Sequence, residues 1–384
     1  MNSRNVQAVL TALRPRRLTE LLAQAVDAYS PTYAEAPATE VFERALERGG
    51  LAVERQAVAN PSGNGPRHNL LVRRGPEPLA LLLVGHVDTI PAGRGAMRFA
   101  PARIDGDQLI GLGAADMKSG CAAMVEALLA VAESGIALRH GVGLALVVGE
   151  EEYGDGSAAL PAGFVAPLTV VGEPTNLSPC IEHYGYLECQ LLSRGVRSHA
   201  ALAGQGSGAI HALLTWLLGI LDGAEPRTAG IAINPRLVQG GGELFVVADQ
   251  CEATLDVHWR PGVEVDEIVA AIERGRAEAL HSHGDCQLEY RELFRAAGYS
   301  NRPSEPRLQP LAHAFDVVEL PWTPGVFRSH SDADLFQQRG SVAVVCGPGA
   351  LEAAHAPGES VSLAETERAA RLYASLAALL CSGG

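Results

Sequence analysis

The sequence predicts an α/β fold, a mixed-sheet domain with helices on both faces, together with an inserted α+β domain. Short continuous apolar runs alternate with helical patterns in the first half of the chain, as expected for strands buried on both faces. Residues from about 181 to 294 instead contain alternating strands and two helices, which indicates one open sheet face. Continuous apolar runs return after Pro303. We therefore expect an outer domain of residues 1–180 and 295–384 and an inserted domain of residues 181–294.

Apolar periodicity predicts the elements of both domains. Spacing near 3.6 residues predicts a helix, a continuous apolar run predicts a buried strand, and alternation predicts a half-buried strand. In the outer domain, helices are expected at Thr19–Tyr29, Glu40–Arg48 (ended by Gly49 and Gly50) and Lys118–Ser134 (ended by Gly135), and strands at Asn69–Arg73, Leu79–Gly85, Gly141–Val148, Leu168–Val171 and Ser341–Cys346. In the inserted domain, strands are expected at Tyr186–Leu192, Cys251–Trp259 and near Gln287–Arg291, and helices at about Ala209–Leu221 and Val265–Leu280.

Composition and charge exclude several classes of partner and location. The chain has 384 residues and a formal net charge of −14, and such an acidic surface repels nucleic acid and anionic lipid. We therefore expect neither nucleic acid nor a membrane as a partner, and apolar runs such as Leu79–Val84 are too short to span a bilayer. The seven cysteines are irregularly spaced and the first twenty residues lack an apolar signal core. Both observations favour a cytoplasmic location.

Histidine and carboxylate side chains gather at or just beyond the ends of predicted core strands, where α/β sheets build their sites. They are His86, Asp88, Asp116, the acidic run Glu150–Glu152, Glu173 and His355. Singly, each has an ordinary structural explanation: Asp116 could cap the helix after it, and the acidic run could lie on a solvated loop. Together, two histidines and three carboxylates suit a pair of divalent ions with one bridging carboxylate. His86 and Asp88 are two apart on a strand, so Asp88 can orient the imidazole.

These segments resemble, in order and spacing, the family of two-zinc amidohydrolases that contains acetylornithine deacetylase, succinyl-diaminopimelate desuccinylase, aminoacylase and glutamate carboxypeptidase. The resemblance covers nearly the whole chain, from Ser30-Pro31-Thr32 to His355 and Glu359. Four motifs carry it: His86-Val87-Asp88-Thr89, Gly113 to Gly120, Glu150 to Gly154, and Gly172-Glu173-Pro174-Thr175. The last of these leans toward the deacetylase and desuccinylase branch.

The resemblance implies a role for each of these residues in a catalytic metal-binding domain. His86 and Glu173 would bind one metal ion, Glu152 and His355 the other, and Asp116 would bridge both. Asp88 would orient His86, and Glu151 would be the general base. Glu150 stands where the family's acidic triplet usually begins with Asp. The resemblance also implies a cis peptide bond at Asp116–Met117.

The inserted domain resembles the family's lid and dimerisation domain, so a homodimer is implied. His199, in Gly195-Val196-Arg197-Ser198-His199, would reach the partner's site and stabilise the oxyanion. Arg260 would hold a substrate carboxylate, unless it is only a solvated charge. His330 stands where Gly is common, and would line the substrate pocket or face solvent. Phe245 at the usual Asn position, and Ala200-Ala201-Leu202 in place of small-x-Pro, are departures that weaken any transfer of substrate identity.

These roles predict a metal-dependent hydrolase that cleaves the amide bond of an N-acyl amino acid. Two divalent ions per chain, zinc or else cobalt or manganese, would hold a bridging hydroxide, and Glu151 would take its proton and pass it to the leaving amine. A carboxypeptidase or dipeptidase acting on a short peptide is the alternative, because it needs the same metals and carboxylate clamp. A non-catalytic metal-binding homologue is a third possibility, against which the intact Glu151 argues. Metal analysis would eliminate a purely structural protein with scattered acids.

Overall fold

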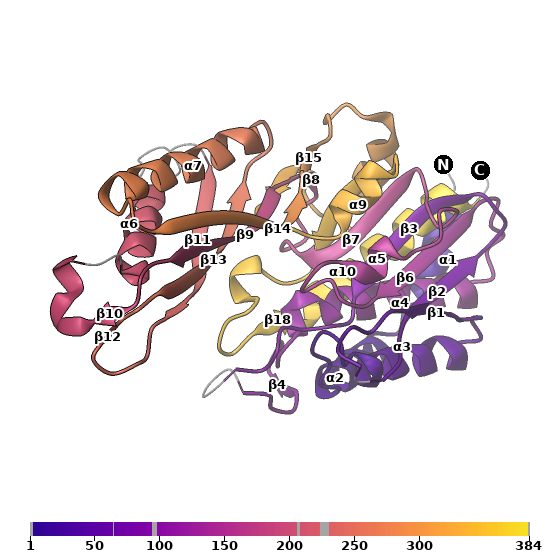
Figure 1. Ribbon diagram of the computed structural model, residues 1–384. Helices are drawn as coiled ribbons and strands as arrows, with labels where there is room; N and C mark the ends of the chain where they lie inside the picture. The colour runs from indigo at the N-terminus through magenta and orange to yellow at the C-terminus, as the bar shows by residue number, and fades with distance from the viewer. Residues whose placement is uncertain (1–2, 64, 94–97, 206–207, 223–229, 383–384) are drawn as a thin grey trace. The chain divides into compact units, whose positions relative to one another are not determined.

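The computed structural model describes residues 3–63, 65–93, 98–205, 208–222 and 230–382. Its contacts divide the chain into two compact units (Figure 1). The larger unit comprises Met1–Ile181, Asn301–Phe327 and Ser331–Gly384, and the inserted unit comprises Glu182–Ser300 and Arg328–His330. Residues 328–330 thus pack with the inserted unit although they lie beyond it in the sequence.

A mixed sheet forms the centre of the larger unit. Its strands are ordered β1 (Glu54–Val58), β2 (Arg67–Arg74), β6 (Gly141–Val147), β3 (Leu79–His86), β7 (Leu168–Pro174), β17 (Val342–Gly347), β8 (Cys180–His183) and β15 (Tyr299–Ser300), with β16 (Gly325–Phe327) paired to β8. The four central strands β6, β3, β7 and β17 are parallel, whereas β1, β2 and β8 pair antiparallel to their neighbours. The carboxyl ends of the four parallel strands therefore meet at one edge, which is where the candidate site lies.

Helices and short elements complete the larger unit. The helices are α1 (Ser3–Ala12), α2 (Pro15–Asp27), α3 (Ala36–Arg48), α4 (Ser119–Glu133), α5 (Asp155–Ala158), α8 (Gln309–Val317), α9 (Ala333–Gln338) and α10 (Leu363–Cys381). A separate small sheet joins β18 (Ser360–Ser362), β5 (Gln108–Ile110) and β4 (Arg103–Asp105). Helices α1, α5, α8, α9 and α10 are additions to the helices expected from the sequence.

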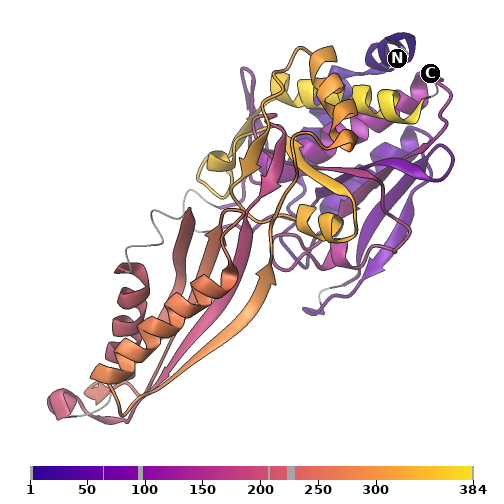
Figure 2. The same ribbon diagram turned by 90° about the horizontal axis from the view of Figure 1, so that it is seen from above.

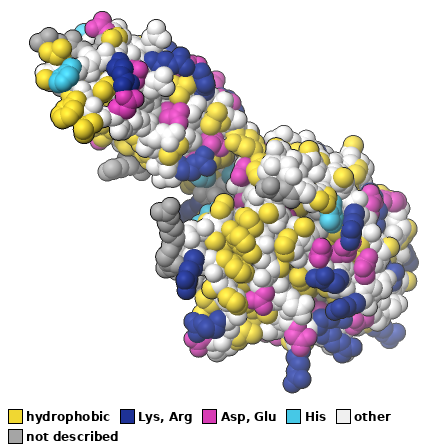
Figure 3. Space-filling model, turned by 60° about the horizontal axis from the view of Figure 1, so that its bottom comes forward, with side chains coloured by type: hydrophobic (Ala, Val, Ile, Leu, Met, Phe, Trp, Pro, Cys, Tyr) yellow, Lys and Arg dark blue, Asp and Glu magenta, His cyan; other side chains and the backbone are white. Residues whose placement is uncertain are grey.

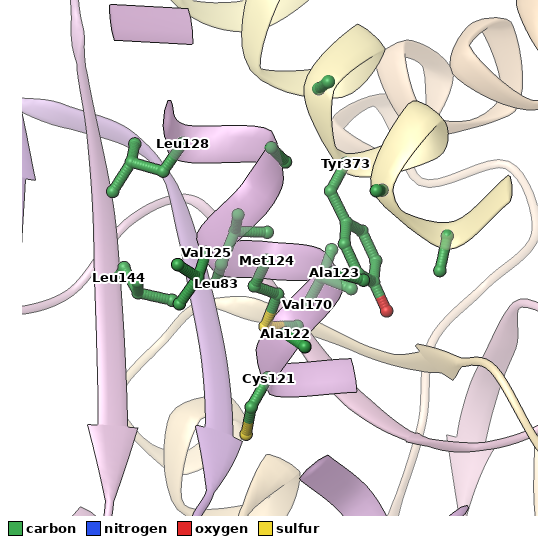
Figure 4. Close-up of a cluster of buried hydrophobic side chains, with 14 of the residues drawn as sticks. Leu83, Cys121, Ala122, Ala123, Met124, Val125, Leu128, Leu144, Val170 and Tyr373 are labelled. Atoms are coloured by element: carbon green, nitrogen blue, oxygen red, sulfur yellow. The ribbon is translucent and has the colours of Figure 1, made fainter. Parts of the chain in front are cut away.

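Helix α4 is buried on all sides, as its apolar sequence requires. Figure 4 shows its side chains between Leu83, Leu144 and Val170 of the sheet on one side and Tyr373 of α10 on the other. Gly120 at its first turn approaches β7 so closely that a Cβ there would overlap the carbonyl oxygen of Gly172. This approach brings the start of α4, and the loop before it, to the end of β7.

The inserted unit has an antiparallel sheet with two helices along one face (Figure 2). Its strands are ordered β11 (Ile231–Gly240), β13 (Gln250–Trp259), β9 (Gly185–Arg194) and β14 (Gln287–Ala296), and its helices are α6 (Ala209–Asp222) and α7 (Val265–Ser282). A second, two-stranded sheet pairs β10 (Ser198–His199) with β12 (Val246–Val247). Leu187, Leu191 and Trp216 belong to the core between the sheet and the helices. The predicted fold class, a mixed α/β domain with an inserted α+β domain, is confirmed.

The surface drawn in Figure 3 combines hydrophobic side chains with charges of both signs. In the view of Figure 3, acidic and basic side chains are intermingled. Among the described residues, the structure contains no helix with the length and apolar character needed to cross a membrane.

Candidate active site

His86, at the end of β3, is the buried centre of the candidate site. Its side chain is 1% exposed, and its Nε2 atom lies 3.1 Å from Asp116 Oδ1, 3.6 Å from Glu173 Oε1 and 3.8 Å from Glu150 Oε2. The other ring nitrogen, Nδ1, lies 3.0 Å from the backbone oxygen of Asp88. A carbonyl oxygen can only accept, so Nδ1 carries a proton and Nε2 faces the carboxylates.

Asp116 lies between the two histidines of the site. It follows the left-handed Gly113 in the loop before α4, and the Asp116–Met117 peptide bond is cis, as expected from the resemblance. One carboxylate oxygen faces His86, and the other lies 3.4 Å from His355 Nε2. His355 Nε2 also lies 2.9 Å from Glu151 Oε2. A single carboxylate thus joins two groups of potential ligands.

The acidic run after β6 sends its first two side chains inward and its third outward. Glu150 lies beside the His86 imidazole, and Glu151 contacts His355. Glu152 is instead exposed and hydrogen-bonds with the Tyr33 hydroxyl. The structure therefore does not bring the expected ligand Glu152 to the site, and it places Glu151 where that ligand was expected. The inward direction ends after two residues because the chain turns directly after the strand.

Asp88 fixes this turn. Its carboxylate accepts hydrogen bonds from the backbone N–H groups of Glu150 (3.3 Å) and Glu151 (3.1 Å) and from the Thr32 hydroxyl (2.9 Å). Its Oδ1 atom is 3.6 Å from His86 Nδ1. The contact of Asp88 with the imidazole is thus made chiefly through its backbone oxygen, while its side chain orients the acidic run.

The buried carboxylates around His86 favour binding of a cation. Burial opposes protonation of His86, but Glu173, Asp116 and Glu150 outweigh it and raise its pKa well above the usual value. Burial, opposed by His86, raises the pKa of Glu173 to about 8. Burial also raises the pKa of Glu150 well above its ordinary value. Such crowding of buried carboxylates is costly unless a positive charge compensates it.

The donor set fits divalent metal ions. Two groups of side chains have ligand atoms within 4.8 Å of one another, His86 with Asp116 and Glu151, and His86 with Glu150 and Glu173. Glu173 Oε1 is buried and lacks a hydrogen-bond partner among the described residues. Imidazole nitrogens and carboxylate oxygens are the ligands that zinc and related ions take at catalytic sites. The site is therefore a candidate metal centre.

Three expected site residues lie in the inserted unit. His199 is exposed, and its Nδ1 atom accepts a hydrogen bond from the Ala201 backbone N–H at 3.2 Å. The Phe245 ring lies parallel to the imidazole, with centroids 6.4 Å apart. Arg260 is exposed and forms no ion pair with a residue that the structure describes. Their approach to a substrate remains an expectation.

His330 packs in an aromatic cluster of the inserted unit. Its ring lies 5.6 Å from that of Tyr186, 5.4 Å from that of Phe294 and 5.9 Å from that of His183, measured between centroids. Burial lowers the pKa of His330 to about 4. The side chain is thus a neutral, half-buried group that packs against three aromatic rings of the inserted unit.

Two residues missed in the sequence lie at the site. Glu150, taken only as the first residue of the triplet, joins the His86 group. Glu359, which marked only the end of the resemblance, accepts hydrogen bonds from the loop that carries Asp116. For Glu150, the sequence did contain a signal: the three glutamates are consecutive, so the pair that faces the site could equally start at Glu150 as at Glu151. For Glu359, which lies 243 residues from Asp116, the sequence contained none.

Comparisons with known proteins support this description. The model of peptidase family M20/M25/M40 matches residues 82–379. Acetylornithine deacetylase of Myxococcus xanthus is 28% identical over 97% of this chain and 99% of its own length. A probable carboxypeptidase of Aspergillus flavus is 26% identical over 86% of this chain and 80% of its own length. A tripeptidase from Staphylococcus aureus is 18% identical with a TM-score of 0.79, covering 95% of this chain and 98% of its own. The chain therefore belongs to peptidase family M20/M25/M40, and it is a hydrolase that acts on amide bonds.

Proposed function

We propose that this protein is a two-metal deacylase that cleaves the amide bond of an N-acyl amino acid. The observation that carries the proposal is the position of Asp116, which presents one carboxylate oxygen to His86 and the other to His355. That arrangement suits a carboxylate that bridges two divalent ions. Zinc is the first candidate, and cobalt or manganese are alternatives.

The geometry supports a ligand assignment shifted by one residue in the acidic run. His86, Asp116 and Glu173 would hold one ion, and Asp116, Glu151 and His355 the other. Glu150 Oε2 lies 3.8 Å from His86 Nε2, and Glu150 also groups with His86 and Glu173 as a potential ligand. We assign Glu150 as the general base because Asp116, which faces both histidines, completes the first ligand set. Glu152 has no role in this scheme, since its side chain faces outward.

The chain's own residues would then handle the protons. When bound, the ions would make water acidic near neutral pH and polarise the substrate carbonyl. Glu150 accepts the proton of the attacking water and returns it to the leaving amine. His199 serves as an oxyanion donor: Ala201 N–H donates to Nδ1, so neutral His199 carries its proton on Nε2 and donates from there. Arg260 would hold a substrate carboxylate bidentately.

A carboxypeptidase or dipeptidase activity on short peptides is the second candidate, supported by the probable carboxypeptidase of Aspergillus flavus. A free substrate carboxylate, and hence the Arg260 clamp, is common to both activities. The full set of carboxylates at the metal centre argues against a non-catalytic homologue. His330 is retained as a proposed substrate-pocket residue, which the rings of Tyr186 and Phe294 hold in place.

We also propose a cytoplasmic homodimer that forms through the inserted unit. All seven cysteines are free, which suits a reducing compartment. The inserted unit exposes several large apolar side chains that a partner subunit would cover. They are Val196, Leu202, Leu214, Leu218, Leu244 and Phe245.

Release of free amine from N-acetyl amino acids, N-succinyl amino acids and dipeptides tests the proposal. Each substrate is offered to protein loaded with zinc, cobalt or manganese, and again after chelation. Chelator-sensitive turnover of the N-acyl amino acids, restored by metal, is expected. Turnover of dipeptides alone would favour the second candidate, and turnover that resists complete metal removal would contradict the metal-dependent mechanism.

A further inference from the structure

Glu359 is a buried carboxylate next to the metal centre that neither ligand set uses. It is 5% exposed, and it forms no ion pair with a described residue. Its Oε1 atom accepts hydrogen bonds from the backbone N–H groups of Ala115 (2.9 Å) and Asp116 (3.0 Å). Its Oε2 atom accepts one from the N–H of Gly113 (2.9 Å). Three peptide groups thus offset part of the cost of burying this carboxylate.

The peptide groups that Glu359 binds belong to the loop that carries Asp116. This loop leads into α4, and its Asp116 carboxylate must face His86 on one side and His355 on the other. The bonds from Gly113, Ala115 and Asp116 fix the backbone on both sides of the turn. Glu359 therefore acts on the direction of the Asp116 side chain through the main chain.

Glu359 also fixes the segment that carries His355, which lies four residues before it. The Glu359 N–H donates to Ala356 O (3.2 Å), and Glu359 O accepts from Gly111 N–H (2.9 Å). His355 has a left-handed backbone (φ 55°) and a side chain that is 48% exposed. Core packing therefore restrains His355 only partly, so its position depends on the anchors of its loop.

We propose that Glu359 is a positioning residue that sets the separation of Asp116 and His355, and thereby the geometry of the metal position that these two residues share with Glu151. The inference rests on the proposed function. Glu359 connects the two ligand-bearing loops through its side chain on one and its backbone on the other. It neither binds the ion nor transfers a proton.

Glu359→Gln removes this connection with little change of volume. The amide oxygen can accept from only one side, so its NH₂ group faces either Gly113 N–H or the N–H groups of Ala115 and Asp116, donor against donor. Glu359→Asp keeps the charge but is one methylene too short to reach all three groups. Glu352→Gln is the matched control, because Glu352 is an exposed carboxylate three residues before His355.

Cobalt titration of the metal-free full chain measures the effect directly. The wild type and Glu352→Gln should bind two ions per chain with the same visible spectrum. For Glu359→Gln and Glu359→Asp, we expect the weaker of the two sites to lose about 10- to 100-fold in affinity, as when partners that orient ligands are removed, with an altered absorption of that ion. Chelator competition gives the affinities, and circular dichroism checks that each variant is folded.

The outcomes separate this inference from the proposed function. A wild type that binds no cobalt overturns the two-metal proposal itself. A wild type that binds two ions, with both Glu359 variants matching it in affinity and spectrum, overturns the positioning role alone. If Glu359→Gln does not fold, Glu359→Asp decides, since it retains the buried charge and the hydrogen bonds within its reach.

Discussion

The acidic run Glu150–Glu152 offers a direct test of the site, because the structure places its three side chains in three different surroundings. Each is replaced in turn by glutamine, which keeps the shape of the side chain and removes its charge. Glu150 faces the His86 group, Glu151 faces His355 at 2.9 Å, and Glu152 faces outward. The three variants should therefore differ from one another in metal content and turnover.

The magnitudes follow from these positions. Glu150→Gln removes the proposed base, so kcat should fall about 10²- to 10⁴-fold, or about 3–5 kcal/mol in the barrier, with metal content unchanged. Glu151→Gln removes a charged ligand, so the protein should lose affinity for one ion and activity with it. Glu152→Gln keeps an acceptor for the Tyr33 hydroxyl, and as a surface change it should alter stability by less than about 0.5 kcal/mol and leave kcat near that of the wild type.

The assay measures bound metal per chain, kcat and KM for all three variants with one substrate from the panel. Excess metal should rescue Glu151→Gln in part and Glu150→Gln not at all. A Glu152→Gln variant that loses metal, combined with a Glu151→Gln variant that keeps metal but loses turnover, would refute the structural register and restore the assignment made from the sequence.

Two further predictions concern Asp88 and His330. The Asp88→Asn side chain cannot accept hydrogen bonds from Thr32, Glu150 and Glu151 at once, so kcat should fall about 10- to 100-fold with KM little changed. Steady-state kinetics measures both constants, and an unaltered kcat would contradict the orienting role of Asp88. His330 has a pKa lowered to about 4 by burial, against 6.5 unfolded, so the unfolded chain takes up a proton below pH 6.5 that the native protein refuses. Stability should therefore be full above pH 6.5 and fall by up to roughly 3 kcal/mol toward pH 4. His330→Phe should weaken this dependence in urea unfolding at pH 7 and 5, and equal slopes for both proteins would disprove it.

Much of the fold and the general location of the site could be predicted from the sequence. Continuous apolar runs such as Leu79–Gly85 mark strands buried on both faces, and the helix before Gly135 is apolar on every side. Because these patterns are local, they can be recognised without knowing which elements the strand or helix packs against. The segments with His86, Asp116 and Glu173 were likewise located by their places at strand ends, and the cis peptide at Asp116–Met117 followed from the resemblance.

The direction of each side chain in the acidic run could not be predicted from a local sequence pattern. Three consecutive glutamates have the same chemistry, and their directions depend on where the chain turns after β6. That turn is fixed by hydrogen bonds to Asp88, which lies 62 and 63 residues away. Similarly, Glu359 contacts the Asp116 loop across more than 240 residues, and His330 enters an aromatic cluster whose members come from distant strands.

The sequence by itself determined the α/β architecture, the inserted α+β part and the identity of the segments that supply histidines and carboxylates. These properties depend on apolar periodicity and on the order of residues along the chain, which are local quantities. Only the tertiary structure decided which glutamate faces which histidine and which carboxylate orients the loop that carries Asp116. Those outcomes depend on hydrogen bonds between segments that meet only when the parallel strands align at one edge of the sheet.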